Sequence, residues 1–341
     1  MITNKNIKYI NELIQPQHLI SKLPLTQKLS DFINNSRKSI ENILNKNDNR
    51  KLFIVGPCSI HNCEEAKIYA NQLKYLSSEV EDKIFVVMRV YFEKPRSTIG
   101  WKGLINDPDL NNTYNINKGL QLAREFLIYC NTIELPCACE MLDTITPQYI
   151  SDLISWGAIG ARTTESQIHR QMVSGLSMPI GFKNNTNGDI DIAIDAIISC
   201  KNKHSFLGIN DKGNASICIT KGNNNTHIIL RGSKDGPNYY TENVKSVEEK
   251  LLKKNIDQNI LIDCSHGNSR KDYRNQESVL LDVLNQIKNG NTSIIGVMIE
   301  SYLNEGNQPF GENLRFGVSI TDSCINIQTT NRILINFYNE L

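Results

Sequence analysis

A few side chains that can bind a metal ion stand at or just beyond the ends of short apolar runs. They are, in order, Cys58, His266, Glu300 and Asp322. A thiolate, an imidazole and two carboxylates are all recognised metal ligands, although a cysteine or histidine taken singly is usually a packing residue. One sulfur ligand argues against Mg²⁺, and two oxygen ligands argue against a closed structural zinc site. One divalent ion is therefore expected, with Mn²⁺, Fe²⁺, Co²⁺ and Zn²⁺ all open. His61, close behind Cys58, is expected to cap or pack the first loop instead.

Lysine and arginine side chains gather at the ends of the same kind of run. The set is Arg89, Lys94, Arg96, Arg162, Lys183 and Arg231. Like charges in one place repel one another, so a cluster of this kind normally binds a polyanion. Guanidinium groups match carboxylate and phosphate oxygens, and lysine adds a compact charge. The cluster indicates a ligand with a carboxylate and a phosphate, or two phosphorylated ligands, whereas any one of these cations alone could be a solvated surface charge.

Eight short apolar runs rich in β-branched residues position these side chains. They span residues 51–57, 83–90, 135–142, 156–162, 178–183, 227–232, 259–265 and 293–301. Helical patterns lie between them, at 64–80, 115–131, 188–199 and 277–289. Eight strands alternating with helices predict an α/β fold, a (β/α)8 TIM barrel, in which the active site lies at the carboxyl ends of the strands. A doubly wound open sheet is the alternative, but no GxGxxG motif follows the first strand.

Two segments lie outside this alternation. Residues 1–48 form an N-terminal extension with an amphipathic helical pattern, in which Ile33, Ile40 and Ile43 are helically spaced. Residues 205–220 place two apolar runs on either side of turn-forming residues, which predicts a β-hairpin inserted after the fifth strand. Residues 49–341 are thus predicted to form the catalytic barrel, with the hairpin inserted in it.

The charge balance excludes several classes of partner. The chain has 37 lysine and arginine residues against 36 aspartate and glutamate residues, so no global basic field points to nucleic acid or to an anionic membrane. No apolar stretch has the length of a signal peptide or a membrane span, and nine cysteines show no disulfide framework. A cytoplasmic protein with reduced thiols is expected.

The motifs around these residues resemble those of a known family. In order, the chain contains "GPCSIH", "MRVYFEKPR", "GWKGLINDP", "GAIGARTTESQ", "GFKN", "HIILRG", "DCSHGNS", "ESYLNEGNQ" and "SITDSC", which together resemble metal-dependent 3-deoxy-D-arabino-heptulosonate 7-phosphate (DAHP) synthases. The resemblance covers nearly the whole chain and implies the barrel, the extension and the hairpin. It also implies a transferase that condenses phosphoenolpyruvate with erythrose 4-phosphate and water to DAHP and phosphate, the first step of the shikimate pathway to chorismate and aromatic amino acids.

The resemblance gives roles to individual positions. The implied metal ligands are Cys58, His266, Glu300 and Asp322. The implied phosphoenolpyruvate contacts are Arg89, Lys94, Arg162, Lys183 and Arg231, and the implied erythrose 4-phosphate contacts are Pro95, Arg96, Ser97 and Asp322. Lys94, Cys58 and His266 are the implied catalytic residues, with Lys94 the candidate proton donor to the forming alkoxide. Ser97 replaces the family's usual threonine but keeps the hydroxyl, so little loss is expected.

Feedback inhibition by an aromatic amino acid is also implied, in a pocket made by the hairpin, nearby connections and a neighbouring subunit's N-terminal segment. The matching positions are Pro147, Gln148, Met172, Leu176, Ser177, Phe206, Gly208 and Cys218. The segments "SGLSMP" and "FLGIN" look most like tyrosine-inhibited members, because Gly208 replaces the serine of the phenylalanine-inhibited type and leaves room for a phenolic hydroxyl. The apolar members of this set would serve equally as ordinary core. A homodimer or homotetramer is expected.

Two alternatives stay open. A 3-deoxy-octulosonate 8-phosphate synthase shares the barrel and the phosphoenolpyruvate site, but it is a shorter chain without the extension or the hairpin and uses another aldose phosphate. A catalytically dead barrel that binds only an amino acid is the second alternative. The presence of every matched ligand argues against that second alternative.

Overall fold

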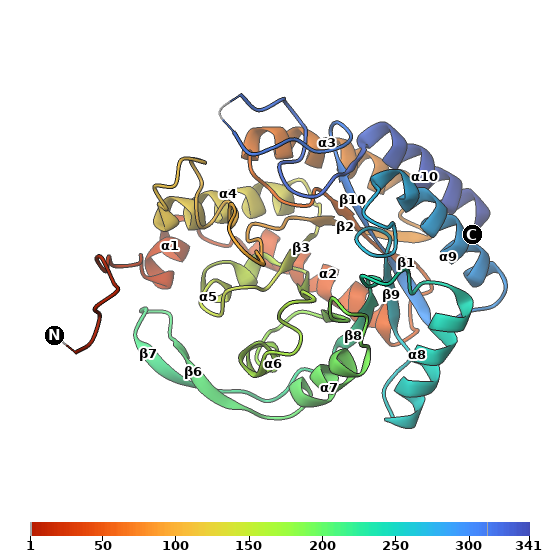
Figure 1. Cartoon of the computed structure of the whole chain (residues 1–341), viewed down its shortest axis with the longest axis horizontal. Helices are drawn as coiled ribbons and strands as arrows, with labels where there is room; N and C mark the ends of the chain where they lie inside the picture. The colour runs from red at the N-terminus through yellow and green to blue at the C-terminus, as the bar shows by residue number, and fades with distance from the viewer. Residues whose placement is uncertain (1, 312) are drawn as a thin grey trace.

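Eight parallel strands close into a barrel that helices cover on the outside (Figure 1). The computed structural model describes residues 2–311 and 313–341. The barrel strands are β1 (Lys51–Gly56), β2 (Ile84–Arg89), β3 (Cys137–Glu140), β4 (Trp156–Ile159), β5 (Ile180–Lys183), β8 (Thr226–Leu230), β9 (Ile260–Asp263) and β10 (Ile294–Tyr302). Pairing of β1 with β10 closes the ring, and the short β11 (Ile325–Asn326) adds to β10. The predicted (β/α)8 fold is confirmed, and every barrel strand overlaps the run from which it was predicted.

The strands form because their side chains are buried on both faces. Along β1, Leu52 and Ile54 belong to the apolar cluster inside the barrel. Phe53 and Val55 alternate with them and pack on the outer side, where the Phe53 ring meets a helix. Gly296 of β10 faces Leu52, and a Cβ at Gly296 would lie 1.8 Å from Leu52 O. Glycine therefore lets β10 approach β1 closely enough to close the ring.

The outer helices differ widely in length. They are α3 (Cys63–Glu79), α4 (Ile116–Thr132), α6 (Gln167–Val173), α7 (Asp191–Cys200), α8 (Thr241–Lys253), α9 (Gln276–Lys288) and α10 (Ile327–Glu340), with the short turns α5 (Pro147–Ile150), η1 (Ser151–Leu153) and η2 (Tyr273–Asn275). α3, α4, α7 and α9 overlap the four predicted helical segments. α5 and α6 are too short to show a helical period in the sequence. α8 and α10 were not among the predicted helices.

The second of two N-terminal helices closes the amino-terminal end of the barrel. α1 (Pro16–Lys22) and α2 (Gln27–Leu44) precede β1. On α2, Ile40, Ile43 and Leu44 lie in the same apolar cluster as the inner side chains of the barrel. Asn259, just before β9, donates its side-chain amide to Leu44 O at 2.9 Å. Part of the predicted extension therefore packs as barrel core, while its role in oligomer contacts and regulation stays a prediction.

A separate hairpin lies between β5 and β8 in the sequence. β6 (Ser205–Ile209) and β7 (Ala215–Ile219) pair antiparallel, in the segment where a hairpin was predicted, and run along the outside of the molecule (Figure 1). One face is partly buried, and the other exposes Leu207, Ile217 and Ile219 at 86, 71 and 81%. The hairpin tip meets the start of α1, where Gln17 N donates to Asp211 O at 2.7 Å. Across the described residues, no helix combines the length and apolarity that a membrane crossing needs.

Candidate active site

A cavity of about 830 Å³ opens at the carboxyl ends of the barrel strands. Its lining includes all six predicted cations: Arg89, Lys94, Arg96, Arg162, Lys183 and Arg231. Three cations that were not predicted also line it, namely Lys234, Arg270 and Lys271. Against these nine stand four carboxylates, from Glu140, Asp235, Glu300 and Asp322. In a chain of net charge +1, this cavity alone carries an excess of five positive charges, which suits it to polyanions.

The four predicted metal ligands lie close together at this cavity. Cys58 Sγ and carboxylate oxygens of Glu300 and Asp322 are within 4.8 Å of one another. His266 Nε2 is 3.8 Å from Glu300 Oε1 and 3.9 Å from Asp322 Oδ2. One sulfur, one imidazole nitrogen and two carboxylates thus face one another across a short distance. This donor set fits a first-row divalent ion.

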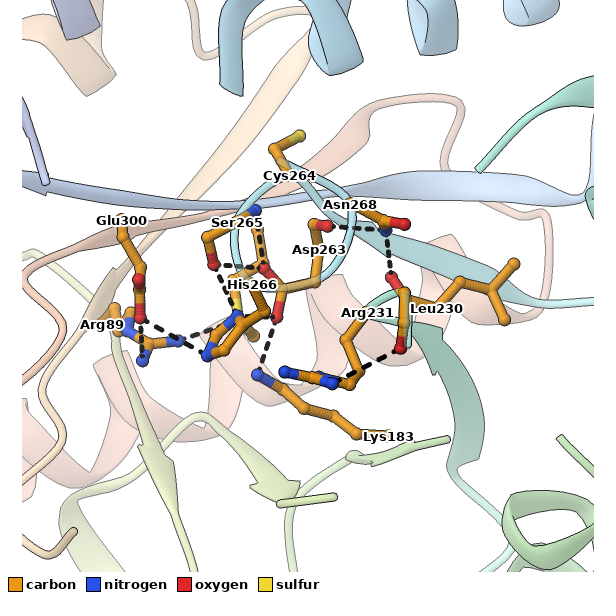
Figure 2. Close-up of polar contacts among 12 residues, drawn as sticks. Arg89, Lys183, Leu230, Arg231, Asp263, Cys264, Ser265, His266, Asn268 and Glu300 are labelled. Atoms are coloured by element: carbon orange, nitrogen blue, oxygen red, sulfur yellow. Dashed lines mark hydrogen bonds and ion pairs between the residues drawn. The ribbon is translucent and has the colours of Figure 1, made fainter. Parts of the chain in front are cut away.

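His266 is held so that one ring nitrogen is left for a ligand (Figure 2). Its φ of +58° lies in the left-handed region. The Ser265 hydroxyl donates to Asp263 Oδ1 at 2.6 Å, and His266 Nδ1 lies 2.9 Å from Asp263 Oδ2. The Ser265 oxygen also lies 2.6 Å from His266 Nδ1. Because the Ser265 hydroxyl proton is donated to Asp263, this oxygen accepts from Nδ1–H, and the lone pair of Nε2 is left for the other ligands. The sequence predicted His266 as a ligand but gave Asp263 no role.

Asp263 also joins the metal site to the cation cluster. Its Oδ2 accepts from Lys183 Nζ at 2.8 Å, and the Asp263 side chain is fully buried. Burial raises the pKa of Asp263, but its close neighbours His266 and Lys183 outweigh this and hold that pKa well below its usual range. Asp263 therefore stays ionised and fixes the positions of both neighbours.

Two buried cations contact the predicted metal ligands directly. Arg89 Nη2 is 2.9 Å from Glu300 Oε1, and both side chains are 1% exposed. Lys94 Nζ donates to Cys58 O at 3.0 Å and lies 3.2 Å from Cys58 Sγ. Burial, with the charge of Glu300, raises the pKa of the Cys58 thiol to about 11, although Lys94 opposes this. Because the thiolate is the ligand form, the sulfur needs a further positive charge beside it, as a bound metal ion would provide.

The predicted sugar-phosphate segment lies at the cavity wall. Pro95, Arg96 and Ser97 all line the cavity, and Arg96 Nε donates to Trp101 O at 2.7 Å. Arg162 Nε donates to Ser97 Oγ at 3.1 Å, so this segment meets a cation of the other predicted substrate site. Within the part of the chain that the structure describes, Arg89 and Lys183 are paired with carboxylates, while Arg162 and Arg231 have no ion-pair partner. The latter two are therefore available to an anionic ligand.

Comparison with known proteins decides the family. A model of the DAHP synthetase I family matches residues 25–335. The chain belongs to this family. It is 50% identical over 337 residues to the Phe-sensitive phospho-2-dehydro-3-deoxyheptonate aldolase of Escherichia coli K12, over 98% of this chain and 96% of that one. It is 48% identical over 326 residues to a tyrosine-inhibited aldolase of that name from Schizosaccharomyces pombe, over 94% and 88% of the two chains. The solved structure of a phospho-2-dehydro-3-deoxyheptonate aldolase from Francisella tularensis SCHU S4 matches with a TM-score of 0.96 and 50% identity, over 98% of each chain.

The family resemblance read from the sequence is confirmed, yet some residues at the family's site were missed. Glu140 ends β3, lines the cavity and is 6% exposed. Its Oε1 has no hydrogen-bond partner among the described residues, and a Cβ at Gly160 would lie 2.1 Å from it. Gly160 therefore leaves room for this carboxylate at the cavity wall. The sequence feature that could have identified Glu140 as a site residue was its position at the end of a predicted strand.

His61 packs rather than caps. Asn62 is the N-cap of α3, and its side chain accepts from Glu64 N and Glu65 N. The buried His61 ring lies edge-on to Tyr302, with its Nε2 3.6 Å from Glu65 Oε2. Burial lowers the pKa of His61 to about 4, which keeps the ring neutral. Neither ring nitrogen of His61 belongs to the group of possible metal ligands formed by Cys58, Glu300 and Asp322.

The predicted inhibitor residues fall on three neighbouring elements. Pro147 and Gln148 begin α5, Met172 is on α6, and Leu176 and Ser177 follow α6; Phe206, Gly208 and Cys218 lie on the hairpin. Phe206 and Cys218 are cross-strand partners, and both are partly buried. A Cβ at Gly208 would lie 2.7 Å from Cys218 Sγ, so that sulfur takes part of the room beside the glycine. The assignment of these residues to an inhibitor site stays a prediction.

Glu93 links the substrate segment to the connection that follows β3. Its side chain is 4% exposed, and its Oε1 accepts from the Thr146 hydroxyl at 3.3 Å. Burial, followed by the charge of Asp143, raises the pKa of Glu93 to about 8 from an ordinary 4.5. Between about pH 4.5 and pH 8, the folded protein therefore keeps a proton on Glu93 that the unfolded chain has lost.

The free energy of unfolding should therefore depend on this carboxyl group. Its contribution is fully present below pH 4.5 and is lost as the pH rises through about 8, at about 1.4 kcal/mol per pH unit or less. Urea denaturation of Glu93→Gln should show a flatter decline in stability from about pH 5.5 to 8. Glu249→Gln, on the exposed side of α8, serves as the control and should keep the original slope. Equal slopes in the two variants would contradict the role of Glu93.

Proposed function

We propose that this chain is a DAHP synthase that condenses phosphoenolpyruvate with D-erythrose 4-phosphate and water to give DAHP and phosphate. The observation that carries the proposal is a cavity with five excess positive charges next to a Cys, His, Glu and Asp ligand set. The cations would bind two multiply charged substrates, and the metal ion would activate the aldehyde. Membership in the DAHP synthetase I family supports the same reaction.

The cations hold and orient phosphoenolpyruvate. Arg162 and Arg231, which lack carboxylate partners among the described residues, would bind its phosphate and carboxylate, while Lys183 is fixed by Asp263. Arg96 and Ser97 would bind the phosphate of erythrose 4-phosphate on the same wall. Holding the two anions in contact turns an encounter between repelling molecules into an intramolecular step.

The reaction then forms one carbon–carbon bond and releases phosphate. C3 of phosphoenolpyruvate attacks the aldehyde carbon, and the aldehyde oxygen takes a proton, for which Lys94 is the donor beside Cys58. Water adds at C2 and loses a proton. The bond between C2 and the bridging oxygen then breaks, so that this oxygen leaves with inorganic phosphate and C2 becomes the ketone carbon of DAHP. A divalent ion held by Cys58, His266, Glu300 and Asp322 would act as a Lewis acid toward the aldehyde. The ion is Mn²⁺, Fe²⁺, Co²⁺ or Zn²⁺.

Phosphate release tests this function. Purified protein, stripped with a chelator and then supplied with each metal, should release phosphate from phosphoenolpyruvate plus erythrose 4-phosphate and be inactive without metal. Arabinose 5-phosphate in place of erythrose 4-phosphate should give little release. Preference for arabinose 5-phosphate would favour the octulosonate alternative, and no turnover with any metal would favour a dead barrel.

Arg162→Ala should mainly weaken phosphoenolpyruvate binding. A charge-assisted hydrogen bond to the substrate is worth about 1.5–3 kcal/mol, so KM for phosphoenolpyruvate should rise about 10- to 100-fold with a smaller change in kcat. Initial-rate kinetics at saturating erythrose 4-phosphate measure both. Arg274→Ala, which removes an exposed arginine paired with Asp272, is the control. An unchanged KM in Arg162→Ala would remove this residue from the substrate site.

Feedback inhibition is the finer part of the proposal. Relatives are described as Phe-sensitive or tyrosine-inhibited, which supports an aromatic amino acid effector here. The partly buried face of the hairpin would bind it, and tyrosine is proposed on the strength of the "FLGIN" segment. Dose–response curves with each aromatic amino acid decide the matter, and inhibition by phenylalanine alone would refute the tyrosine assignment.

A homodimer or homotetramer is proposed as the working assembly. The exposed hairpin face and the exposed Ile7, Tyr9 and Ile10 of the N-terminal segment offer apolar surface for a second copy. All nine cysteines are free in the described structure, in agreement with a reducing cytoplasm. Sedimentation analysis measures the assembly, and a monomer at micromolar concentration would contradict it.

A further inference from the structure

Asp322 differs from the other predicted metal ligands in how it is supported. Cys58 and Glu300 are almost wholly buried, and His266 is fixed by Asp263, whereas 66% of the Asp322 side chain is exposed. Asp322 lies in an irregular loop between β10 and β11. A ligand on such a loop needs support from the residues around it, because ligand position controls metal affinity.

The side chain of Asn307 provides support on both sides of Asp322. Its Nδ2 donates to Thr321 O at 3.0 Å, and its Oδ1 accepts from the Ser323 hydroxyl at 2.9 Å. Asn307 also lines the cavity. One amide group thus bridges the residue before the ligand and the residue after it, which fixes the backbone from which the carboxylate projects.

The backbone near Asn307 repeats this attachment. Gly306 N donates to Cys324 O at 2.8 Å, and Cys324 N donates to Gly306 O at 3.1 Å. Gln308 N donates to Ser319 O at 2.8 Å. The strand-like segment around Asn307 is therefore paired with residues on both sides of Asp322. This pairing fixes the backbone of Asn307 and so the position of its side-chain amide.

A second contact ties Asp322 to another ligand. The hydroxyls of Ser59 and Thr321 are 2.8 Å apart, with the two residues 0 and 9% exposed. Ser59 follows Cys58, and Thr321 precedes Asp322. This buried hydrogen bond joins the immediate neighbours of two ligands that lie more than 260 residues apart in the chain.

We propose that Asn307, together with the Ser59–Thr321 hydroxyl pair, positions the Asp322 carboxylate against Cys58 and Glu300 and thereby sets the affinity of the metal site. These are positioning residues, since none of them is a ligand in the proposed set. The inference rests on the proposed metal site. Partners of this kind typically change metal affinity by about 10- to 100-fold when removed.

Direct Mn²⁺ binding to the full chain, without substrates, tests the proposal. Asn307→Ala should weaken Mn²⁺ binding about 10-fold in a calorimetric titration. Asn304→Ala is the matched control, because Asn304 lies in the same loop and donates its amide to Phe316 O at 2.8 Å, with no hydrogen bond to residues 321–323 among the described residues. The Asn304→Ala variant should bind Mn²⁺ with an affinity within about 2-fold of that of the unmodified chain. The metal concentration that gives half-maximal activity should rise only in Asn307→Ala. At saturating metal, the KM of Asn307→Ala for phosphoenolpyruvate should be unchanged.

Thr321 variants keep the test decisive if Asn307→Ala folds poorly. Thr321→Val keeps the shape but removes the hydroxyl and should weaken Mn²⁺ binding, and Thr321→Ser keeps the hydroxyl and should restore it. Asn307→Ala and Thr321→Val that bind Mn²⁺ as tightly as the unmodified chain would overturn the inference alone. An unmodified chain that binds no divalent metal would overturn the metal site and this inference together.

Discussion

Cys58→Ala should abolish metal-dependent phosphate release while the barrel stays folded. The sulfur is one of the four proposed ligand atoms, and it is fully buried with Lys94 Nζ 3.2 Å away. Removal of a ligand should weaken metal binding by more than the 10- to 100-fold typical of a lost supporting partner. Turnover should then fall below detection at micromolar metal, measured as phosphate released.

The fold should survive because the change removes one buried atom. Loss of the Cys58 sulfur would leave a small cavity at the end of β1, with an expected cost of about 1–2 kcal/mol in the free energy of unfolding. Lys94 keeps its hydrogen bond to the carbonyl of residue 58. Circular dichroism and urea denaturation measure this cost separately from activity.

Cys264→Ala is the matched control. Cys264 is equally buried and also follows a barrel strand, but its side chain points away from His266 and Glu300 (Figure 2). This variant should bind Mn²⁺ and turn over like the unmodified chain. Full metal-dependent activity in Cys58→Ala, with loss in Cys264→Ala, would place the ligand set elsewhere.

The strands and the strand-end site could be predicted from sequence because local composition determines them. The run around Phe53 is β-branched and apolar, and it ends at Gly56-Pro57, so both the strand and its end were visible. Parallel strands bring their carboxyl ends to one end of the barrel. The proximity of Cys58 and Glu300 could therefore be predicted from their positions at strand ends alone.

The remaining features depend on contacts between distant segments. Ile40 and Ile43 showed a helical period, but only the closed barrel shows that they fill its amino-terminal end. The orientation of His266 depends on its left-handed backbone and on Asp263, and neither is encoded in the spacing of apolar residues. Glu140 becomes a site residue only because Gly160, just after the next strand, leaves room for it.

Lys94→Met should lower kcat by about 10²- to 10⁴-fold, the range expected for loss of a general acid. Lys94 Nζ is buried beside Cys58 Sγ and lines the cavity, so its proton is available where the alkoxide forms. Burial lowers the pKa of Lys94, but the interaction with Cys58 beside it outweighs this and raises it overall. The side chain is therefore protonated at neutral pH and can act as a donor.

The same ammonium also acts on the neighbouring sulfur. Its positive charge opposes the burial that raises the pKa of Cys58, so its removal should raise that pKa further and weaken metal binding at neutral pH. Saturating metal should restore binding without restoring kcat, which separates the two effects. Titration of activity with Mn²⁺ at several pH values measures both.

Lys102→Met is the control for Lys94→Met. Lys102 is exposed, although its carbonyl accepts from Lys94 N at 2.8 Å, so the two lysines share one segment but not the site. Its kcat should change less than about 2-fold, because a solvated charge contributes little. If Lys94→Met raised only KM for phosphoenolpyruvate and kept kcat at saturating metal, Lys94 would serve in binding and the proton would have to come from another group. The near contact of Nζ with Sγ makes the loss of kcat the expected result, because it places this proton beside the ion that would hold the aldehyde.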